Sequence, residues 1–121
     1  MMLFRVDPNS PLPLADQVAA CVRGAISDGT VHPGERLPAA GRLAESLGIN
    51  VHTVLRGYQQ LRDEGLIELR RGRGAVVTQS ATPGRTRLLA HARDLVVEAR
   101  GLGMSDEDVL ALVRASLTED R

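Results

Sequence analysis

The stretch from residue 43 to residue 77 constrains the fold most, because signals for two helices and a hairpin follow one another with few residues between them. A short apolar helix pattern over residues 43–47 stops at Gly48, a residue suited to a left-handed helix cap. Asn50 can cap a second helix that runs to a stop at Gly65. Two helices joined by a sharp turn are therefore expected. The apolar stripe predicted to face the core of the second helix consists of Val54, Tyr58 and Leu61, with Leu55 beside it.

The arginine-rich segment RRGRG, residues 70–74, separates two short β-prone runs, LIEL and AVVT. Two such runs joined by a tight, glycine-containing connection predict a β-hairpin. Its tip carries Arg71 and Arg73 on either side of Gly72. A glycine at this place would let the backbone come close to a partner.

One more helix is predicted before this stretch. Apolar residues recur at steps of three and four from Leu14 to Ile26 and predict a helix that ends near Gly29. The segment MLFRV, residues 2–6, can be a short strand or an extended arm, and VHPGERLP predicts a turn. Helix, short helix, helix and hairpin are the elements of a winged helix-turn-helix in their usual order. In that fold the third helix enters the major groove, and the hairpin, or wing, reaches the flanking backbone or minor groove.

The last third of the chain predicts a helical tail. The segment QSATPG has the composition of a linker, so we predict a winged helix-turn-helix DNA-binding domain at residues 1–79, a linker at 80–84 and a dimerisation tail at 85–121. One tail helix follows the linker, and Ser105 with Asp108 forms a capping box for a second. Both apolar faces are too broad for one pair of helices to bury, which predicts a homodimer. The expected dimer contacts are Leu88, Leu89, Ala92, Leu95, Val96, Ala99, Val109, Leu112, Val113 and Leu117. The predicted fold class is mainly α with a small β wing (α+β).

Charge is distributed unevenly, although the 121 residues carry a formal net charge of zero. Residues 36–79 contain seven arginines and four acids, whereas the chain from residue 80 onward contains six arginines and seven acids. Double-stranded DNA can be bound by a local cationic patch, so Arg36 and Arg42 become candidate contacts. Aromatic residues make up only 2% of the chain, which argues against a protein that stacks unpaired bases.

Other functional classes find little support in the sequence. Cys21 is the only cysteine, so neither a disulfide framework nor a thiolate metal cluster is expected. His32, His52 and His91 are too scattered to suggest a metal site. The acidic clusters have no accompanying base or nucleophile, so we expect neither an enzyme nor a cofactor. No apolar run is long enough to span a membrane and the N-terminus lacks a secretion signal, which predicts a cytoplasmic protein.

The segment GERLPAAGRLAESLGINVHTVLRGYQQLRDEGLIELRRGRGAVV resembles the GntR family of bacterial transcription regulators. The turn, the helix, the L-x-x-x-G-L-I motif and the R-G-x-G wing all occur in register. N-x-x-T-V followed by Y-x-x-L is most similar to the YtrA-type branch, whose members carry a short pair of C-terminal helices. The resemblance implies DNA contacts at the start of the recognition helix and at the wing: Asn50, Val51, His52, Thr53, Arg56, Arg71, Gly72 and Arg73.

The resemblance further implies a repressor that binds an inverted-repeat operator in double-stranded DNA as a homodimer. It identifies no small-molecule effector, and the tail is too small to enclose a typical metabolite cavity. The chain departs from the common family pattern at two positions. Val51 stands where many members have a guanine-reading arginine, and Gly41 stands where relatives often have an arginine, one position before Arg42. The operator sequence therefore does not carry over from the family.

Each candidate contact also has a simpler interpretation. His52 can meet a base or phosphate or be merely solvated, and Thr53 can bind a phosphate or only help the helix to start. Arg71 and Arg73 can be solvated charges, although Gly72 between them favours DNA contact. The alternative function is a protein-interaction module or the reading head of a larger complex. Such a module would expose an apolar patch on the third helix, whereas the arginine wing favours duplex DNA.

Overall fold

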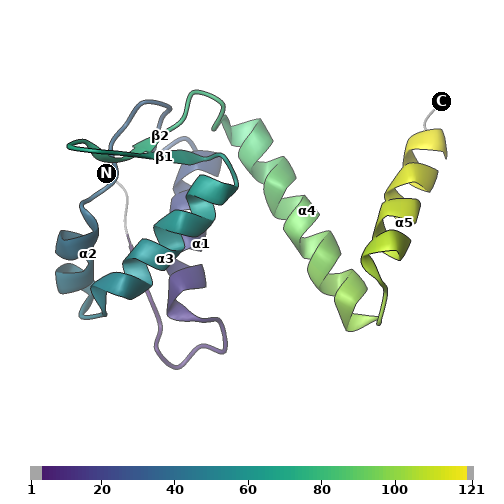
Figure 1. The fold of residues 1–121 in the computed structure, drawn as a ribbon, viewed down its shortest axis with the longest axis horizontal. Coiled ribbons are helices and arrows are strands. Elements are labelled where there is room, and N and C mark those ends of the chain that lie inside the picture. The colour runs from purple at the N-terminus through teal and green to yellow at the C-terminus, as the bar shows by residue number, and fades with distance from the viewer. Residues whose placement is uncertain (1–3, 120–121) are drawn as a thin grey trace. The chain divides into compact units, whose positions relative to one another are not determined.

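The computed structural model describes residues 4–119, which form five helices and one two-stranded sheet (Figure 1). One compact unit extends to Arg87 and a second begins at Leu88. We call them the N-terminal unit and the C-terminal unit. The order of elements confirms the predicted class, mainly α with a small β wing. The elements are α1 (Leu14–Ser27), α2 (Ala40–Leu47), α3 (Val51–Asp63), β1 (Ile67–Arg70), β2 (Gly74–Val77), α4 (Pro83–Gly101) and α5 (Asp106–Glu119).

The N-terminal unit is built around the packing of α3 against α1. Apolar residues spaced by three and four give each of these helices one buried face. A Cβ added at Gly57 would lie 2.8 Å from the carbonyl oxygen of Ala15 and 3.1 Å from Val18. Position 57 therefore tolerates no side chain while the helices remain this close. The fully buried apolar side chains of the unit include Val18, Val22, Ile26, Val54, Leu61, Leu66, Ile67 and Val77.

Helix α3 is held at both ends and in the middle. Asn50 caps it as predicted, because its Oδ1 accepts the backbone N–H two residues later at 2.8 Å. Directly after the helix, Glu64 accepts two bonds from Arg23 of α1, Nε–Oε1 at 2.8 Å and Nη2–Oε2 at 2.6 Å. The hydroxyl of Tyr58 donates to the carbonyl oxygen of Pro38 at 2.7 Å, and burial raises the pKa of this hydroxyl. These contacts fix the orientation of the exposed face of α3.

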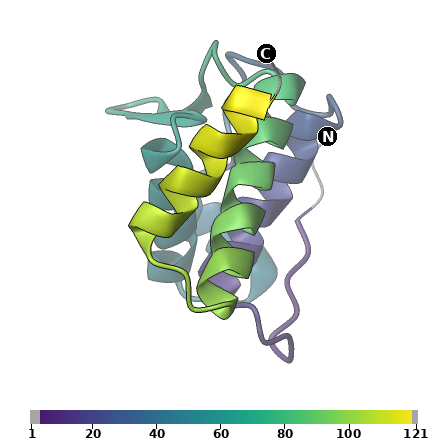
Figure 2. The same ribbon diagram turned by 90° about the vertical axis from the view of Figure 1, so that its right-hand side faces the viewer.

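The wing is an antiparallel hairpin whose strands pair along their whole length. Both strands lie one residue closer to the tip than predicted, at 67–70 and 74–77. The tip closes with the backbone N–H of Arg73 donating to the carbonyl oxygen of Arg70 at 3.1 Å. The outer edge of β2 is paired with the loop before α2, where the N–H of Leu37 donates to Ala75 at 2.9 Å. Figure 2 shows the hairpin extending sideways from the helices of the N-terminal unit.

The chain before α1 is an arm without helix or strand over residues 4–6, while residues 2 and 3 of the predicted strand or arm lie outside the described residues. Gln17 of α1 holds the turn that joins this arm to the helix. Its amide nitrogen donates to the carbonyl oxygens of Asp7 at 2.9 Å and Leu12 at 2.7 Å, and its Oε1 accepts the N–H of Asp7 at 2.6 Å.

Helix α4 is continuous across the division between the units, and its first turn belongs to the N-terminal unit. The helix starts at Pro83, inside the predicted linker. Thr86 is fully buried, and Nη1 of Arg87 donates to the carbonyl oxygen of Ser27 at 3.3 Å. The N-terminal compact unit of the structure therefore extends to Arg87.

The C-terminal unit is a pair of helices running in opposite directions (Figure 2). The chain reverses at Gly103, whose φ of +77° lies in the left-handed region that favours glycine. The predicted capping box is confirmed: the N–H of Ser105 donates to Oδ2 of Asp108, and the N–H of Asp108 donates to Oγ of Ser105, both at 3.1 Å. None of the residues of α5 is buried, and Leu110, Leu112, Val113 and Leu117 are exposed in the single chain.

Candidate nucleic-acid interface

The predicted contacts on the recognition helix lie together at the N-terminal end of α3. Asn50, Val51, His52 and Arg56 are exposed, and Thr53 is half-buried. The buried face of the same helix packs on the core, so these side chains occupy the solvent side. A helix N-terminus also carries a partial positive charge, which favours phosphate nearby.

Asn50 and Thr53 have roles within the protein as well. Because Oδ1 of Asn50 accepts the capping bond, only its amide NH2 is free to donate outward. Thr53 and Arg56 line a shallow hollow of about 400 Å³ beside the start of α1. Gln60 lies in the same hollow, and its Nε2 donates to Oδ1 of Asp16 at 2.7 Å. This side of α3 is therefore polar.

The wing tip exposes Arg71, Gly72 and Arg73 to solvent. Gly72 has φ of +79°, and no heavy atom lies within 4 Å of the position that a Cβ would take. The backbone conformation rather than crowding requires glycine here. Within residues 4–119, neither Arg71 nor Arg73 forms an ion pair, whereas Arg70 lies 2.8 Å from Oε2 of Glu68. The two predicted arginines thus carry uncompensated charge.

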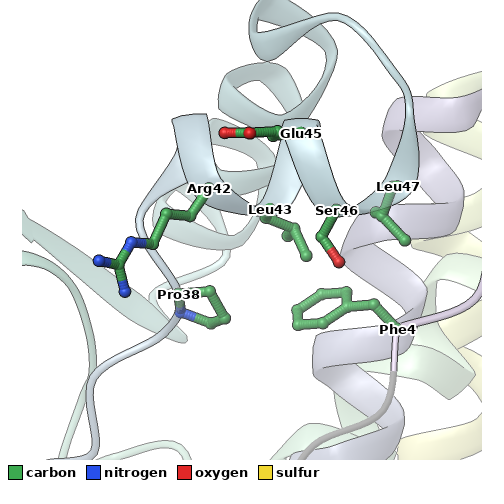
Figure 3. Close-up of a pocket in the computed structure, with 7 residues that line it drawn as sticks. All are labelled: Phe4, Pro38, Arg42, Leu43, Glu45, Ser46 and Leu47. Carbon is green, nitrogen blue, oxygen red and sulfur yellow. The ribbon is translucent and has the colours of Figure 1, made fainter.

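Arg36 and Arg42 occupy different places. Nε of Arg36 donates to the carbonyl oxygen of Arg73 at 3.1 Å, so Arg36 supports the wing tip from the loop before α2. Arg42 is exposed on α2. Figure 3 shows its guanidinium pointing away from Phe4 and Leu43, which line a shallow hollow of about 620 Å³. The support that Arg36 gives to the tip has no signal in the sequence, because the two residues are far apart in the chain.

Unpaired positive charge gathers on the elements that carry the predicted contacts. Arg23 is paired with Glu64, and Arg62 lies 3.5 Å from Asp63. The arginines of residues 36–79 that form no ion pair with another described residue are Arg36, Arg42, Arg56, Arg71 and Arg73. This distribution suits an anionic, extended ligand such as a nucleic-acid backbone.

One exposed residue on α3 was missed by the sequence analysis. Leu55 was placed beside the apolar stripe of α3, yet its side chain is largely exposed. With Leu69 of β1 and Tyr58 it lines a hollow of about 420 Å³ between α3 and the wing. The signal was present, since Leu55 directly follows the buried Val54 and so points away from the stripe formed by positions 54, 58 and 61.

Half of the ten predicted dimer contacts are exposed in the C-terminal unit, among them Leu88, Leu112 and Leu117, and four more are half-buried. Ala99 is only 3% exposed, so it is already covered in the single chain and offers little surface to a partner. Further large apolar side chains lie on the surface although the sequence analysis did not select them, because a search for one stripe overlooks residues on other sides of a helix. These are Val97, Leu102 and Leu110.

Residues 4–119 bring no three His, Cys, Asp or Glu side chains together as metal ligands. None of the helices in this range combines the length and the apolar character needed to cross a membrane.

Comparison with known sequences finds one protein family. The family described as "Bacterial regulatory proteins, gntR family" matches residues 14–77, from α1 to the end of β2. The HTH-type transcriptional regulator Rv1152 of Mycobacterium tuberculosis is 34% identical over 107 residues, covering 88% of each chain. The HTH-type transcriptional repressor YtrA of Bacillus subtilis is 29% identical over 110 residues, covering 87% of this chain and 85% of the relative.

Comparison with solved structures agrees. YtrA from Sulfolobus acidocaldarius, a GntR-family transcription factor, superposes with a TM-score of 0.60 at 29% identity, covering 95% of this chain and 97% of the other. The DNA-binding domain of AraR in complex with its operator ORX1 superposes with a TM-score of 0.55 at 26% identity. That match covers 61% of this chain and 92% of the AraR domain.

Proposed function

Because the chain belongs to the GntR family and is a DNA-binding transcriptional regulator of the YtrA type rather than an enzyme, we propose that it represses transcription by binding an inverted-repeat operator as a homodimer. One observation carries the proposal: Arg71 and Arg73 stand unpaired at a glycine-built wing tip in a domain whose recognition helix exposes its first turns. Uncompensated guanidinium groups at such a tip are placed to neutralise phosphates.

The proposed contacts divide by role. The N-terminal end of α3 enters the major groove, where His52 and Arg56 donate to base edges. Thr53, Arg42 and the amide of Asn50 donate to phosphates and set the register. At the wing, Arg71, Gly72 and Arg73 meet the flanking backbone or minor groove, and the terminal nitrogens of Arg36 add charge behind them.

The homodimer is supported by the uncovered apolar side chains of the C-terminal unit. A second copy of this unit would remove them from water. To read one face of the duplex, the two recognition helices of a dimer must lie about one helical turn apart, ~34 to 36 Å. Repression is supported by the Bacillus subtilis relative, which is a repressor. The proposed place of action is the bacterial cytoplasm, where the duplex DNA lies.

The function is tested by selecting bound fragments from random duplex DNA and determining the mass of the complex by sedimentation. We expect an enriched inverted repeat bound by two copies of the chain. Transcription from a promoter that carries this repeat should fall when the protein is added. Selection that enriches no duplex sequence would overturn the proposal, and enrichment of a single half-site by a monomer would overturn its dimeric part.

The wing is tested by the salt dependence of binding. Replacing Arg71 and Arg73 with Ala should flatten the slope of log K against log salt by about two phosphate units per subunit, and should weaken specific and non-specific binding alike. The matched control replaces Arg100 and Arg114, which removes the same number of charges from the C-terminal unit. An unchanged slope in the wing variant would show that the tip points away from DNA.

A further inference from the structure

The exposed face of α3 has two chemically different edges. Val51 and Leu55 are four residues apart and share one edge, and His52 and Arg56 share the other. Leu55 lines the hollow on the wing side, whereas Arg56 lines the hollow beside α1. The recognition helix therefore presents an apolar edge towards the wing and a polar edge towards α1.

The apolar edge is unusual in the N-terminal unit because its large apolar side chains are exposed. Val51 is 36% exposed, Leu55 38% and Leu69 of β1 40%. Only one other large apolar side chain of the described N-terminal unit, Leu12, is exposed to this degree. Arg70 and Arg71 line the wing-side hollow together with Leu55 and Leu69. A ligand that fits this edge must combine small apolar groups with negative charge beside them.

Duplex DNA offers that combination only at thymine. In the major groove, thymine alone presents a methyl group, which lies between two phosphate backbones. A protein partner fits less well, because three side chains, each less than half exposed, cannot supply the ~800 Å² per partner of a standard interface. The occupant that matches both the small apolar strip and the arginines at its rim is thymine in duplex DNA.

We propose that Val51 reads a thymine 5-methyl group in each half-site, with Leu55 keeping the same edge apolar one turn further along. The inference rests on the proposed function and deepens it by naming a base. Val51 is the first residue of α3, directly after the Asn50 cap that fixes the start of the helix. In a recognition helix, this is the end that meets base edges.

The chemistry of valine explains why thymine should be preferred over the other three bases. Valine has no donor or acceptor, so guanine, adenine or cytosine opposite it would have polar edge atoms stripped of water without a partner. A methyl group instead gains by losing contact with water. The β-branched side chain of valine has few rotamers, so little conformational entropy is lost when the contact forms. The half-site should therefore contain thymine at the position next to the base pair read by His52.

The test removes the methyl group and nothing else. Each thymine of the selected operator is replaced in turn by deoxyuridine, symmetrically in both half-sites, and the dissociation constant is measured for the wild type and for Val51→Ala. One methyl contact corresponds to about fourfold in affinity, so a symmetric pair should cost about tenfold or more. We expect this loss at one thymine position in the wild type and its absence in Val51→Ala.

The neighbouring variant His52→Ala is the matched control. It alters the polar edge of the same helix, so it should change base preference elsewhere and keep the full sensitivity to deoxyuridine. Circular dichroism checks that Val51→Ala is folded, as expected for an exposed position. The inference is overturned if no deoxyuridine substitution weakens the wild type, or if Val51→Ala keeps the sensitivity. Either result leaves operator binding intact, whereas failure of the proposed function would appear earlier, as a selection without an enriched duplex.

Discussion

The two units of this protein contain well-formed helices, but they differ in how completely the chain covers them. The N-terminal unit buries α1, the inner face of α3 and the strands of the wing around one core. In the described part of the C-terminal unit, Ala99 is the one buried residue, and α5 has none. The first unit is a finished fold that displays a surface for recognition. The second has secondary structure without a core of its own, which supports the proposed dimerisation.

The largest effect is expected from placing a charge in the C-terminal unit. Leu112→Asp should give a folded monomer and lower operator affinity by two orders of magnitude or more, because a carboxylate cannot be buried cheaply between apolar helices. Sedimentation and operator titration measure the two effects. Leu95→Asp should have the same two effects.

A matched control for that variant is Thr118→Asp, which adds the same charge to α5 at an exposed polar position. It should leave the dimer and the operator affinity nearly unchanged. A wild-type protein that sediments as a monomer at micromolar concentration and binds its operator one subunit at a time would contradict the interpretation of the C-terminal unit.

The core of the N-terminal unit is already filled, so even one added methyl group should destabilise it. Gly57→Ala places a methyl group 2.8 Å from the carbonyl oxygen of Ala15, so α3 must move away from α1. We expect a loss of about 1 to 3 kcal/mol in the free energy of unfolding. The control is Gly41→Ala, in the open on α2, which should stabilise by up to about 1 kcal/mol. Equal urea midpoints for the two variants would show that the helices are not packed this closely.

Substitutions in the two units should also differ in how they affect the base preference of binding. His52→Ala or Arg56→Ala should alter the preference at one or two base pairs by about 1 to 3 kcal/mol each. Leu112→Asp should instead lower affinity for all operator variants by the same factor, because it acts through dimerisation. Competition among single-base variants of the operator measures both patterns. A uniform loss for the two α3 variants would make their side chains phosphate contacts.

The smallest expected difference concerns the two helix caps. Asn50→Ala should lower the free energy of unfolding of the N-terminal unit by about 1 kcal/mol, and Asn50→Gly by only a few tenths. Ser105→Ala removes the corresponding cap of α5, which packs on no core in the single chain, so it should reduce helix content and dimer affinity without moving that unfolding transition. A shift of the same transition by Ser105→Ala would show that the units are energetically coupled.

Much of the fold was predictable because its signals are local. The caps at Asn50 and Ser105, the stop at Gly48 with φ of +68° and the arginine tip of the wing each depend on a few neighbouring residues. The exposed start of the recognition helix followed from the same periodicity that identified its buried face. The first turn of α4 has no such local signal, since it belongs to the N-terminal unit through contacts such as that of Arg87 with Ser27.

The amino-acid sequence is sufficient to predict which elements form, where each begins and ends to within a few residues, and which segment carries surplus positive charge. Local propensity and helical periodicity are sufficient for this. The sequence does not show which arginines remain unpaired, how Arg36 supports the wing tip, or that Leu55 lies beside Leu69 of the wing. Each of these depends on residues distant in the chain coming together. Such contacts follow from the packing of α3 between α1 and the wing, which no short stretch of sequence encodes.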